Sequence, residues 1–405
     1  MANIAILGYG TVGSGVVEVL NTNQSIISKK AGKEINVKYV LDLREFPGDP
    51  IESKLVNDYE IIVNDPDVHI IAEVMGGVNP AYSFVKRALE AGKSVCTSNK
   101  ELVAAYGSEL LAIAKEKNIN FLFEASCGGG IPIIRPLNSS LTADELEEIT
   151  GILNGTTNYI LSKMFHQGLE FEDVLKEAQE KGYAERNPAA DVEGHDACRK
   201  IAILSSLAFG QQVDYADIYT EGITKVTATD IAYAKKAGFT IKLLASSKKV
   251  GESVYAMVAP FWVSVDHPLY SVNEVYNAIY VQGNVLGSVM FYGSGAGKLP
   301  TASAVVSDVV EAAKNLNTTI MTPWSSKKLN LADISNATGK YFVRLQGETK
   351  AALQKAREIF GEIMQIQVEN IHSEIGFITE ELSEAEYQAK AEMLSNIISM
   401  FRLQR

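Results

Sequence analysis

The chain begins with a short apolar run that ends in a glycine turn within its first thirteen residues. Ile4–Leu7 has the continuous apolar character of a strand buried on both faces. The next six residues, Gly8-Tyr9-Gly10-Thr11-Val12-Gly13, have the spacing G-x-G-x-x-G, and the periodicity from Val12 to Leu20 predicts a helix. A strand, a tight glycine turn and a helix in this order are typical of the phosphate-binding start of a dinucleotide-binding domain.

Each glycine of the turn has its own expected role. Gly8 permits the tight turn, Gly10 lets the backbone approach a pyrophosphate, and Gly13 lets the helix pack closely on the strand. The helix that opens at Thr11 and Val12 offers free N–H groups and a partial positive charge to phosphates. We therefore predict cofactor contacts from these five residues. The alternative is a purely structural glycine turn in another kind of α/β domain.

Strand and helix patterns alternate through the rest of the first 125 residues. Two helices are expected, at Pro80–Ala91 and Glu101–Lys117. The further expected strands are Val37–Leu41, Ile61–Val63, Ile70–Val74, Ser94–Thr97 and Phe121–Phe123. Apolar strands alternating with helices predict an α/β fold with a parallel, doubly wound Rossmann-type sheet in residues 1–125, completed by residues 301–320.

The remaining sequence predicts three further segments. Residues 126–300 mix long helices (171–181, 191–209, 229–237) with β-rich stretches (255–265, 278–291), and indicate an α+β domain for substrate binding and dimerisation. Residues 321–340 are polar and irregular, as expected of a linker. The elements expected in residues 341–405 follow the order βαββαβ, a split-βαβ sandwich. They are strands at 341–345, 363–371, 375–380 and 397–403, and helices at 349–360 and 383–396.

Composition narrows the class of protein. The chain has 405 residues and a net charge of −12, with acidic and basic residues interspersed, so we expect no nucleic-acid partner. It has no apolar run of 18 residues, so we expect no transmembrane helix. The three cysteines, Cys96, Cys127 and Cys198, lack zinc-site spacing, and we expect a reducing, cytoplasmic location.

Two segments near the glycine turn carry further candidate cofactor contacts. Asp42 ends the second expected strand, where a carboxylate accepts a hydrogen bond from the adenine ribose and favours NAD over NADP. Arg44 could instead face a 2′-phosphate, and Asp42 could be a solvated loop carboxylate, so the choice between NAD and NADP stays open. Ser98 and Lys100 follow another expected strand, at the edge where open α/β sheets bind ligands. A surface lysine at a helix start is the alternative for Lys100.

A second lysine lies in the dense polar segment 182–200. Asp196 and Lys200 are four residues apart and share a face if this segment is helical. A lysine beside a carboxylate can act as a proton donor or acceptor. An ordinary surface ion pair on a helix is the alternative, and spacing alone favours it.

Over residues 4–315 the chain resembles homoserine dehydrogenase. The resemblance is specific, because it spans the glycine turn and several long motifs. These motifs are Gly76-Gly77 with Pro80, Gly92–Val95, Thr97–Lys100, Glu124–Pro132, Gly151–Leu161, Gly182–Lys200, Gly295–Gly297 and Pro300–Ala302. The resemblance implies a reversible, NAD(P)-dependent interconversion of L-homoserine and L-aspartate 4-semialdehyde.

The resemblance also assigns roles to residues of the site. It implies that Lys200 exchanges the proton of the carbinol oxygen, with Asp196 beside it, and that Lys100 contacts substrate and cofactor. It implies that Glu185 receives the substrate amino group, in a pocket lined by Asp191 and Asp196. Gly297 matches a glycine that touches the cofactor.

A structural monovalent cation is implied as well. Glu124, Cys127, Gly129 and Ile131 match its site, mostly through backbone carbonyl oxygens, which suit a hard cation such as Na⁺. The family resemblance further implies a homodimer or homotetramer.

The sequence departs from the family at several positions. Leu43 stands near a place where NADP-preferring members often carry Arg, which favours NAD. His195 is more often aliphatic in the family, and Arg186-Asn187 replaces residues that are commonly acidic.

The last segment, 341–405, resembles an ACT domain, a module that implies feedback by threonine. However, 346–349 reads Gln-Gly-Glu-Thr in place of the usual Asp-x-Pro-Gly turn. We therefore expect weak or no inhibition by threonine, and a role of the module in assembly.

Two other functions are weighed against this one. An acylating semialdehyde dehydrogenase would use Cys127 as its nucleophile, in a glycine-rich loop that suits a thiolate. A small buried side chain is the alternative for that cysteine. A non-enzymatic dinucleotide sensor would bind the cofactor and leave Lys200 dispensable.

Overall fold

The computed structural model describes residues 1–347, 349–369 and 371–404. They form two compact units that interleave along the chain. The first unit comprises 1–146, 202–216 and 291–329, and the second comprises 147–201, 217–290 and 330–405. Glu348 lies outside the described residues, so the turn predicted at 346–349 is described only in part. In the described part of the chain, no helix is both long and apolar enough to cross a membrane.

The first unit is built on a parallel sheet in residues 1–146, all of which are described. Its order, β3-β2-β1-β4-β5-β6, reverses direction at β1, as in a doubly wound fold. The fold class predicted from the sequence is confirmed. The strands are β1 Ala2–Leu7, β2 Ile35–Leu41, β3 Leu55–Val56, β4 Val68–Glu73, β5 Ser94–Thr97 and β6 Phe121–Leu122.

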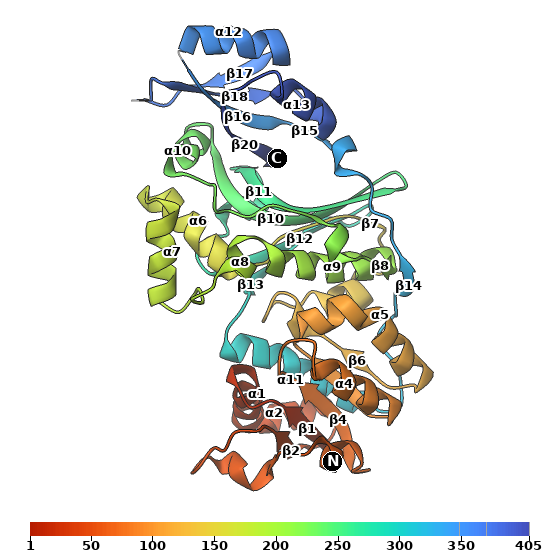
Figure 1. The fold of residues 1–405 in the computed structure, drawn as a ribbon. Coiled ribbons are helices and arrows are strands. Elements are labelled where there is room, and N and C mark those ends of the chain that lie inside the picture. Colours follow the sequence, from red (N-terminus) through yellow and green to blue (C-terminus); the bar gives the residue numbers. More distant parts are fainter. Residues whose placement is uncertain (348, 370, 405) are drawn as a thin grey trace. The chain divides into compact units, whose positions relative to one another are not determined.

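Helices cover both faces of this sheet (Figure 1). A helix from late in the chain, α11 (Lys298–Lys314), packs along α1, because a Cβ at Gly15 would lie only 3.0 Å from the Cβ of Ala302. The absence of a side chain at Gly15 therefore sets the close approach of two helices that are far apart in sequence. The helices that precede α11 in this sheet domain are α1 Thr11–Thr22, α2 Gln24–Ala31, α3 Tyr59–Val63, α4 Ala81–Glu90 and α5 Lys100–Glu116.

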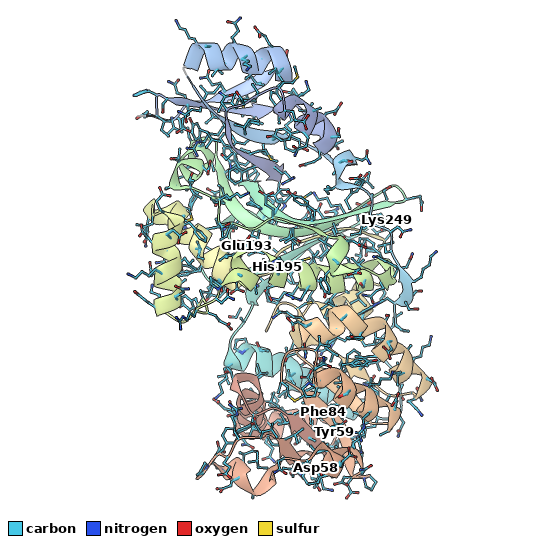
Figure 2. All side chains as sticks on the ribbon, viewed as in Figure 1. Asp58, Tyr59, Phe84, Glu193, His195 and Lys249 are labelled. Atoms are coloured by element: carbon cyan, nitrogen blue, oxygen red, sulfur yellow. The ribbon has the colours of Figure 1, made fainter. Side chains whose placement is uncertain are left out.

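The strand predicted at Ile61–Val63 is wrong, because these residues belong to helix α3. The side chain of Asp58 accepts a hydrogen bond from the backbone N–H of Glu60 and caps the helix. The ring of Tyr59 then stacks on Phe84 of α4 with centroids 4.1 Å apart, in the region labelled in Figure 2. A short apolar run is compatible with either a strand or one helical turn, and here the capping residue Asp58 favours the helix.

The polar stretch after α11 also packs more tightly than a linker would. Trp324 is buried, and its ring fills the space beside Gly107 of α5, where a Cβ would come within 2.4 Å of the indole. The strand β14 (Ser325–Lys328) then pairs with β8 (Gln211–Gln212). Residues up to 329 are therefore anchored on the first unit.

The second sheet has ten strands in the described residues. The path is β13-β12-β7-β10-β11-β20-β16-β18-β17, and β9 adds to β11. The long antiparallel hairpin of β10 and β11 lies at its centre, paired over its whole length. The sequence did not predict β7 or β10. The central strands are β7 Leu146–Ile152, β9 Tyr219–Thr220, β10 Phe239–Val250, β11 Ser253–Ser264, β12 Tyr276–Gly283 and β13 Gly287–Ser294.

The helix expected over residues 191–209 is two helices. Helix α8 (Ala189–Val192) ends before Gly194, whose φ of +83° cannot continue a right-handed helix, and α9 (His195–Phe209) follows. Glu193 and His195, labelled in Figure 2, are exposed on either side of this break. The other helices of this sheet domain are α6 Gly155–Gln167, α7 Phe171–Glu180 and α10 Ala228–Lys236.

The C-terminal module, residues 341–405, has the βαββαβ order predicted for it. Strand β20 pairs with β11, so the module extends the central sheet (Figure 1). Trp262 of β11 stacks on Phe342 with centroids 3.9 Å apart, and Arg344 donates to Asp230 of α10 at 2.9 Å. Its elements are β16 Tyr341–Gln346, α12 Thr349–Phe360, β17 Ile363–Ile366, β18 Glu374–Thr379, α13 Glu384–Ala391 and β20 Ile397–Gln404, and the short strands β15 Thr338–Gly339 and β19 Leu382–Ser383 pair beside them.

Candidate active site

The glycine turn joins β1 to α1 through a close backbone contact. Gly8 has φ +96°, and a Cβ there would lie 3.0 Å from the side chain of Met75. A Cβ at Gly13 would lie 2.0 Å from the carbonyl oxygen of Gly8, a distance that no side chain tolerates. These two glycines therefore perform the turning and close-packing roles that the sequence predicts for them.

The middle glycine faces open space. No atom lies within 4 Å of the position a Cβ would take at Gly10. Gly10 is also the N-cap of α1 and provides no side-chain hydrogen bond to the first turn, which includes Thr11 and Val12. Open space beside the free N–H groups of a twelve-residue helix fits the pyrophosphate of a dinucleotide.

Asp42 is held against the glycine turn. Its carboxylate accepts from the backbone N–H of Tyr9 at 2.8 Å. It also accepts from the side chain of Arg44 at 2.9 Å and 2.8 Å. The Arg44 guanidinium holds the pKa of the Asp42 carboxyl well below its usual range. The side chain of Leu43 is exposed. Asp42 is thus a charged acceptor beside the turn, with Arg44 already engaged by it.

A buried carboxylate outside the predicted site residues, Glu73, organises the loops after β4 and β5. Glu73 is fully buried and accepts from the Thr97 hydroxyl at 2.6 Å and from the Met75 N–H at 2.8 Å. Burial raises the pKa of this carboxyl. Asn99 caps α5 through the Leu102 N–H and donates to the Gly77 carbonyl at 2.6 Å. The loop that carries Ser98 and Lys100 is therefore tied to β4 by side-chain hydrogen bonds.

The predicted pair of Asp196 and Lys200 is present and buried. Lys200 Nζ lies 2.8 Å from Asp196 Oδ2 and 2.7 Å from the Leu153 carbonyl oxygen, and the two side chains are 11% and 9% exposed. An ordinary surface ion pair would be much more exposed. The alternative of an ordinary surface ion pair is therefore wrong for Asp196 and Lys200. The lysine has the partners that an acid or base group needs.

Asn154 completes this cluster, although it is not among the predicted site residues. Its Nδ2 donates to Asp191 Oδ1 at 2.7 Å and to Asp196 Oδ2 at 3.0 Å. Its Oδ1 accepts from the Thr157 N–H and caps α6. One amide thus fixes both carboxylates and a helix end at once.

The predicted residue Glu185 and the residue His195, where the sequence departs from the family, lie outside this network. Glu185 is exposed, and its backbone carbonyl accepts a hydrogen bond from the side chain of Gln179. His195 is exposed at the start of α9. The structure therefore brings together Asp191, Asp196 and Lys200, and leaves Glu185 at the surface.

The two glycine-rich loops of the sequence meet in the first unit. A Cβ at Gly129 would lie 2.4 Å from the carbonyl of Gly295, and one at Gly130 would lie 2.8 Å from Pro300. This packing fixes the segment that carries Gly297, whose φ is +119°. The predicted cation positions 127–131 are therefore in a loop whose backbone is closely confined.

The carboxylate of Glu124 is already satisfied. It accepts from the backbone N–H groups of Ile133, Ile134 and Arg135 at 2.6 to 2.9 Å. Its own N–H donates to Asp308, where burial and the Glu124 charge raise the pKa of the Asp308 carboxyl to about 7. The described residues contain no cluster of three His, Cys, Asp or Glu side chains that could hold a metal. A cation here would therefore use backbone carbonyl oxygens.

Cys127 is fully buried, with its thiol 3.8 Å from the Ser126 hydroxyl. A nucleophile must reach its substrate, so this burial does not support the acylating mechanism.

Comparisons with known proteins agree along the whole chain. A family model described as homoserine dehydrogenase matches residues 132–310, and one described as its NAD binding domain matches residues 8–124. Homoserine dehydrogenase from Bacillus subtilis is 38% identical over 97% of this chain and 94% of its own length.

Solved structures lead to the same family. The homoserine dehydrogenase of Thiobacillus denitrificans has a TM-score of 0.91 at 35% identity, and the match covers 100% of this chain and 98% of that one. A hyperthermophilic archaeal homoserine dehydrogenase in complex with NADPH has a TM-score of 0.65 at 30% identity, covering 77% of this chain and 97% of that one.

Proposed function

This chain belongs to the homoserine dehydrogenase family, and on that premise we propose that Lys200 is its acid–base residue. The enzyme interconverts L-homoserine and L-aspartate 4-semialdehyde with NAD(P), a step of aspartate-family amino-acid biosynthesis. The observation that carries the assignment is the buried contact of 2.8 Å between Lys200 Nζ and Asp196 Oδ2.

The assigned chemistry follows from what must leave the substrate. Oxidation of the carbinol releases a hydroxyl proton and a hydride, and a nicotinamide bound at the glycine turn would supply the hydride acceptor. Neutral Lys200 takes that proton from the carbinol oxygen, and the ammonium returns it in the reverse direction. Asp196 accepts a hydrogen bond from the Lys200 side chain and holds it in place, and Asn154 fixes Asp196.

The other site residues are assigned from the family resemblance. Lys100 contacts substrate oxygen and cofactor, and its loop is ordered by Glu73. Glu185 and Asp191 bind the substrate amino group. Glu185 is exposed, which leaves its carboxylate accessible to a cationic ligand.

For the dinucleotide we propose contacts from Gly8, Gly10, Thr11, Val12 and Gly13, from Ser98 and Lys100, and from Gly297. The open space at Gly10 supports this set. We further propose a preference for NAD, because the Asp42 carboxylate at the end of β2 suits a ribose 2′-OH and repels a 2′-phosphate. The archaeal relative in complex with NADPH makes NADP the competing choice.

A structural Na⁺ is proposed at the backbone carbonyls of Glu124, Cys127, Gly129 and Ile131. The support is the confined loop with two left-handed glycines, Gly128 and Gly129, together with a Glu124 side chain already engaged by backbone N–H groups. Hard oxygen donors suit such an ion.

We propose a homodimer or homotetramer, with residues 126–300 providing the dimer contact. The support is a set of exposed apolar side chains on the β12–β13 hairpin at the edge of the second sheet: Tyr276, Val285, Leu286, Met290 and Tyr292. Light scattering coupled to gel filtration tests it, and a monomer at micromolar concentration contradicts it.

We propose that residues 341–405 form an ACT-like module that serves assembly. Its βαββαβ order supports the likeness. We also propose a cytoplasmic location, in keeping with three buried cysteines that form no disulfide.

One assay tests the proposed site and cofactor together. Reduced cofactor is followed by absorbance with L-homoserine, separately with NAD⁺ and NADP⁺, for the wild type and Glu185→Gln. We expect a higher kcat/KM with NAD⁺, and a raised homoserine KM with an unchanged cofactor KM in the variant. A higher kcat/KM with NADP⁺ refutes the cofactor preference, and an unchanged homoserine KM removes Glu185 from the substrate site.

A further inference from the structure

A cavity of about 270 Å³ lies inside the second unit, where the C-terminal module meets the central hairpin. One wall comes from β10 and β11. The end of β20, which pairs with β11, continues this wall, and residues 334–341, which lead into the module, and the start of α13 provide the rest of the lining. We call this cavity the seam pocket. It lies at the start of β16, opposite the strand end that leads into the 346–349 turn.

The body of the seam pocket is apolar. Met257 and Phe261 of β11 are buried side chains of its wall, and Ile334 packs against the same apolar cluster. Water in such a space lacks hydrogen-bond partners on most sides, whereas an apolar group gains by leaving bulk water. The walls therefore favour a ligand with an apolar body.

The polar groups of the pocket have hydrogen-bond donors in reserve. Lys248 Nζ donates to Gln404 Oε1 at 3.1 Å and lies 3.2 Å from Glu148 Oε2, which uses two of its three N–H groups. Arg402 donates through Nε and Nη2 to Glu384 and through Nη1 to Glu221, which uses three of its five.

The carboxylate of Glu384, the acceptor beside Arg402, has fewer hydrogen-bonding sites left unused. Glu384 receives both bonds from Arg402 and a third from the Tyr341 hydroxyl at 3.2 Å. Among the charged groups that line the pocket in the described residues, the hydrogen-bonding groups left unused are thus mainly N–H donors of cationic side chains. A carboxylate is the matching acceptor, because charge-assisted hydrogen bonds are the stronger kind.

Volume limits the size of the ligand. At about 30 Å³ of liquid volume per water, 270 Å³ corresponds to roughly nine waters, and so to about nine non-hydrogen atoms. From this size, the apolar walls and the cationic donors we propose that the seam pocket binds a small carboxylate with an apolar body of five or six carbons. Such a ligand contacts both β11 and the segment 334–341, and so holds the module against the central sheet.

This site is separate from the Lys200 cluster, so its test does not depend on the proposed catalytic roles. The probes are 4-methylpentanoate, 4-methyl-2-oxopentanoate and leucine, with 4-methylpentan-1-ol as the uncharged control, each titrated into the full-length enzyme by calorimetry to about 10 mM, a range that detects millimolar dissociation constants. Thermal unfolding is recorded in parallel. We expect at least one carboxylate to bind and to raise the unfolding midpoint, and the alcohol to do neither. Leucine separates the sources: its binding indicates a free amino acid, and binding of the two acids alone indicates a deaminated acid.

Two variants locate the binding. Lys248→Gln removes a donor of the pocket, whereas Lys249→Gln changes the next residue of β10, which points to the opposite face and is labelled in Figure 2. We expect the first to weaken binding about tenfold or more and the second to leave it unchanged, as for the loss of one charge-assisted bond. Ala337→Phe fills the pocket and should abolish binding with the activity retained.

The proposal is overturned if no carboxylate binds in this range, if the alcohol binds as tightly as the acids, or if Lys248→Gln and Lys249→Gln weaken binding equally. Unaltered binding in a folded Ala337→Phe variant also places the ligand elsewhere.

Discussion

The glycine turn of the first unit and the lysine cluster of the second unit are held by different kinds of contact. At the turn, backbone meets backbone: the missing side chain of Gly13 lets the helix approach the Gly8 carbonyl. At the cluster, side chains meet side chains: Asn154 holds Asp196, which holds Lys200. The first arrangement should be intolerant of added volume, and the second should be sensitive to lost hydrogen-bond donors.

The largest effect is expected from Gly13→Ala. The new Cβ would lie 2.0 Å from the Gly8 carbonyl oxygen, so β1 and α1 must separate. We expect a loss of about 3 kcal/mol or more in the free energy of unfolding, as for severe overpacking, together with loss of cofactor binding. Urea denaturation and fluorescence titration with reduced cofactor measure both.

Gly10→Ala is the matched control for this substitution. Its Cβ meets no protein atom within 4 Å, so stability should change little while cofactor affinity falls, because the methyl group occupies the space assigned to pyrophosphate. If Gly10→Ala binds the cofactor as the wild type does, backbone approach at this glycine is not what binds it.

A smaller effect is expected from Asn154→Ala, which removes the amide that orients Asp191 and Asp196. We expect kcat to fall by about 10- to 100-fold, the cost of one lost orienting bond at a buried charge. Asn154→Ser keeps a good helix cap for α6 but still lacks the amide donors. Equal losses of kcat in both variants would show that the amide donors of Asn154 are what the site needs. Full activity in Asn154→Ser would reduce the role of Asn154 to capping α6.

Asp42→Ala tests whether the first unit also relies on a side chain. The carboxylate accepts from the Tyr9 N–H and is proposed to accept from the ribose. We expect the KM for NAD⁺ to rise about tenfold and the KM for NADP⁺ to stay level or fall. A tenfold change in the preference between the two cofactors corresponds to the loss of about one hydrogen bond. Leu43→Ala, an exposed neighbour, is the control. Equal rises for both cofactors would show that Asp42 supports the turn without reading the ribose.

Lys242 extends the side-chain network of the second unit and gives the smallest expected effect. It is fully buried on β10 and donates to Asn158 Oδ1 and Asn273 Oδ1 at 3.1 Å and to the Val272 carbonyl at 2.5 Å. Burial lowers its pKa to about 7 from 10.5. Because the folded state releases this proton first, the unfolded state binds more protons between pH 7 and 10.5, and stability should rise with pH in that window.

We therefore expect the wild type to gain about 1–2 kcal/mol in unfolding free energy relative to Lys242→Met between pH 7 and pH 9, within the limit set by one proton. Chemical denaturation at several pH values measures it. Lys236→Met, at an exposed lysine, should follow the wild type. Parallel pH curves for Lys242→Met and wild type would mean that the ammonium keeps an ordinary proton affinity.

Sequence predicts the first region better than the second, and the contacts explain why. The glycine turn is local, since its three glycines fall within six residues, and the Asp196–Lys200 pair is local on one helix. Asn154 meets Asp196 across 42 positions and Glu73 meets Thr97 across 24, so only the fold brings them together. A carboxylate ending a buried apolar strand is the one local signal that could have pointed to Glu73.

The errors in secondary structure have equally specific causes. Asp58 caps helix α3, so the three apolar residues expected as a strand are helical. Gly194, with a positive φ, ends α8 before α9 begins, where one helix was expected. Strand β10 was missed because it is buried along most of its length and carries Lys242 inside, which obscures the alternation of a half-exposed strand. Partners in the fold override local patterns in each case.

If Lys200 moves the substrate proton, Lys200→Ala must lose turnover and keep cofactor binding, and both are measured in the same preparation. Arg199→Ala, the preceding residue on α9, is the control. We predict that kcat for homoserine oxidation falls about 10³-fold, within the range for loss of an acid–base group, while the dissociation constant for the cofactor stays within threefold or so of the wild type. A Lys200→Ala enzyme that keeps a tenth or more of wild-type kcat would contradict the account.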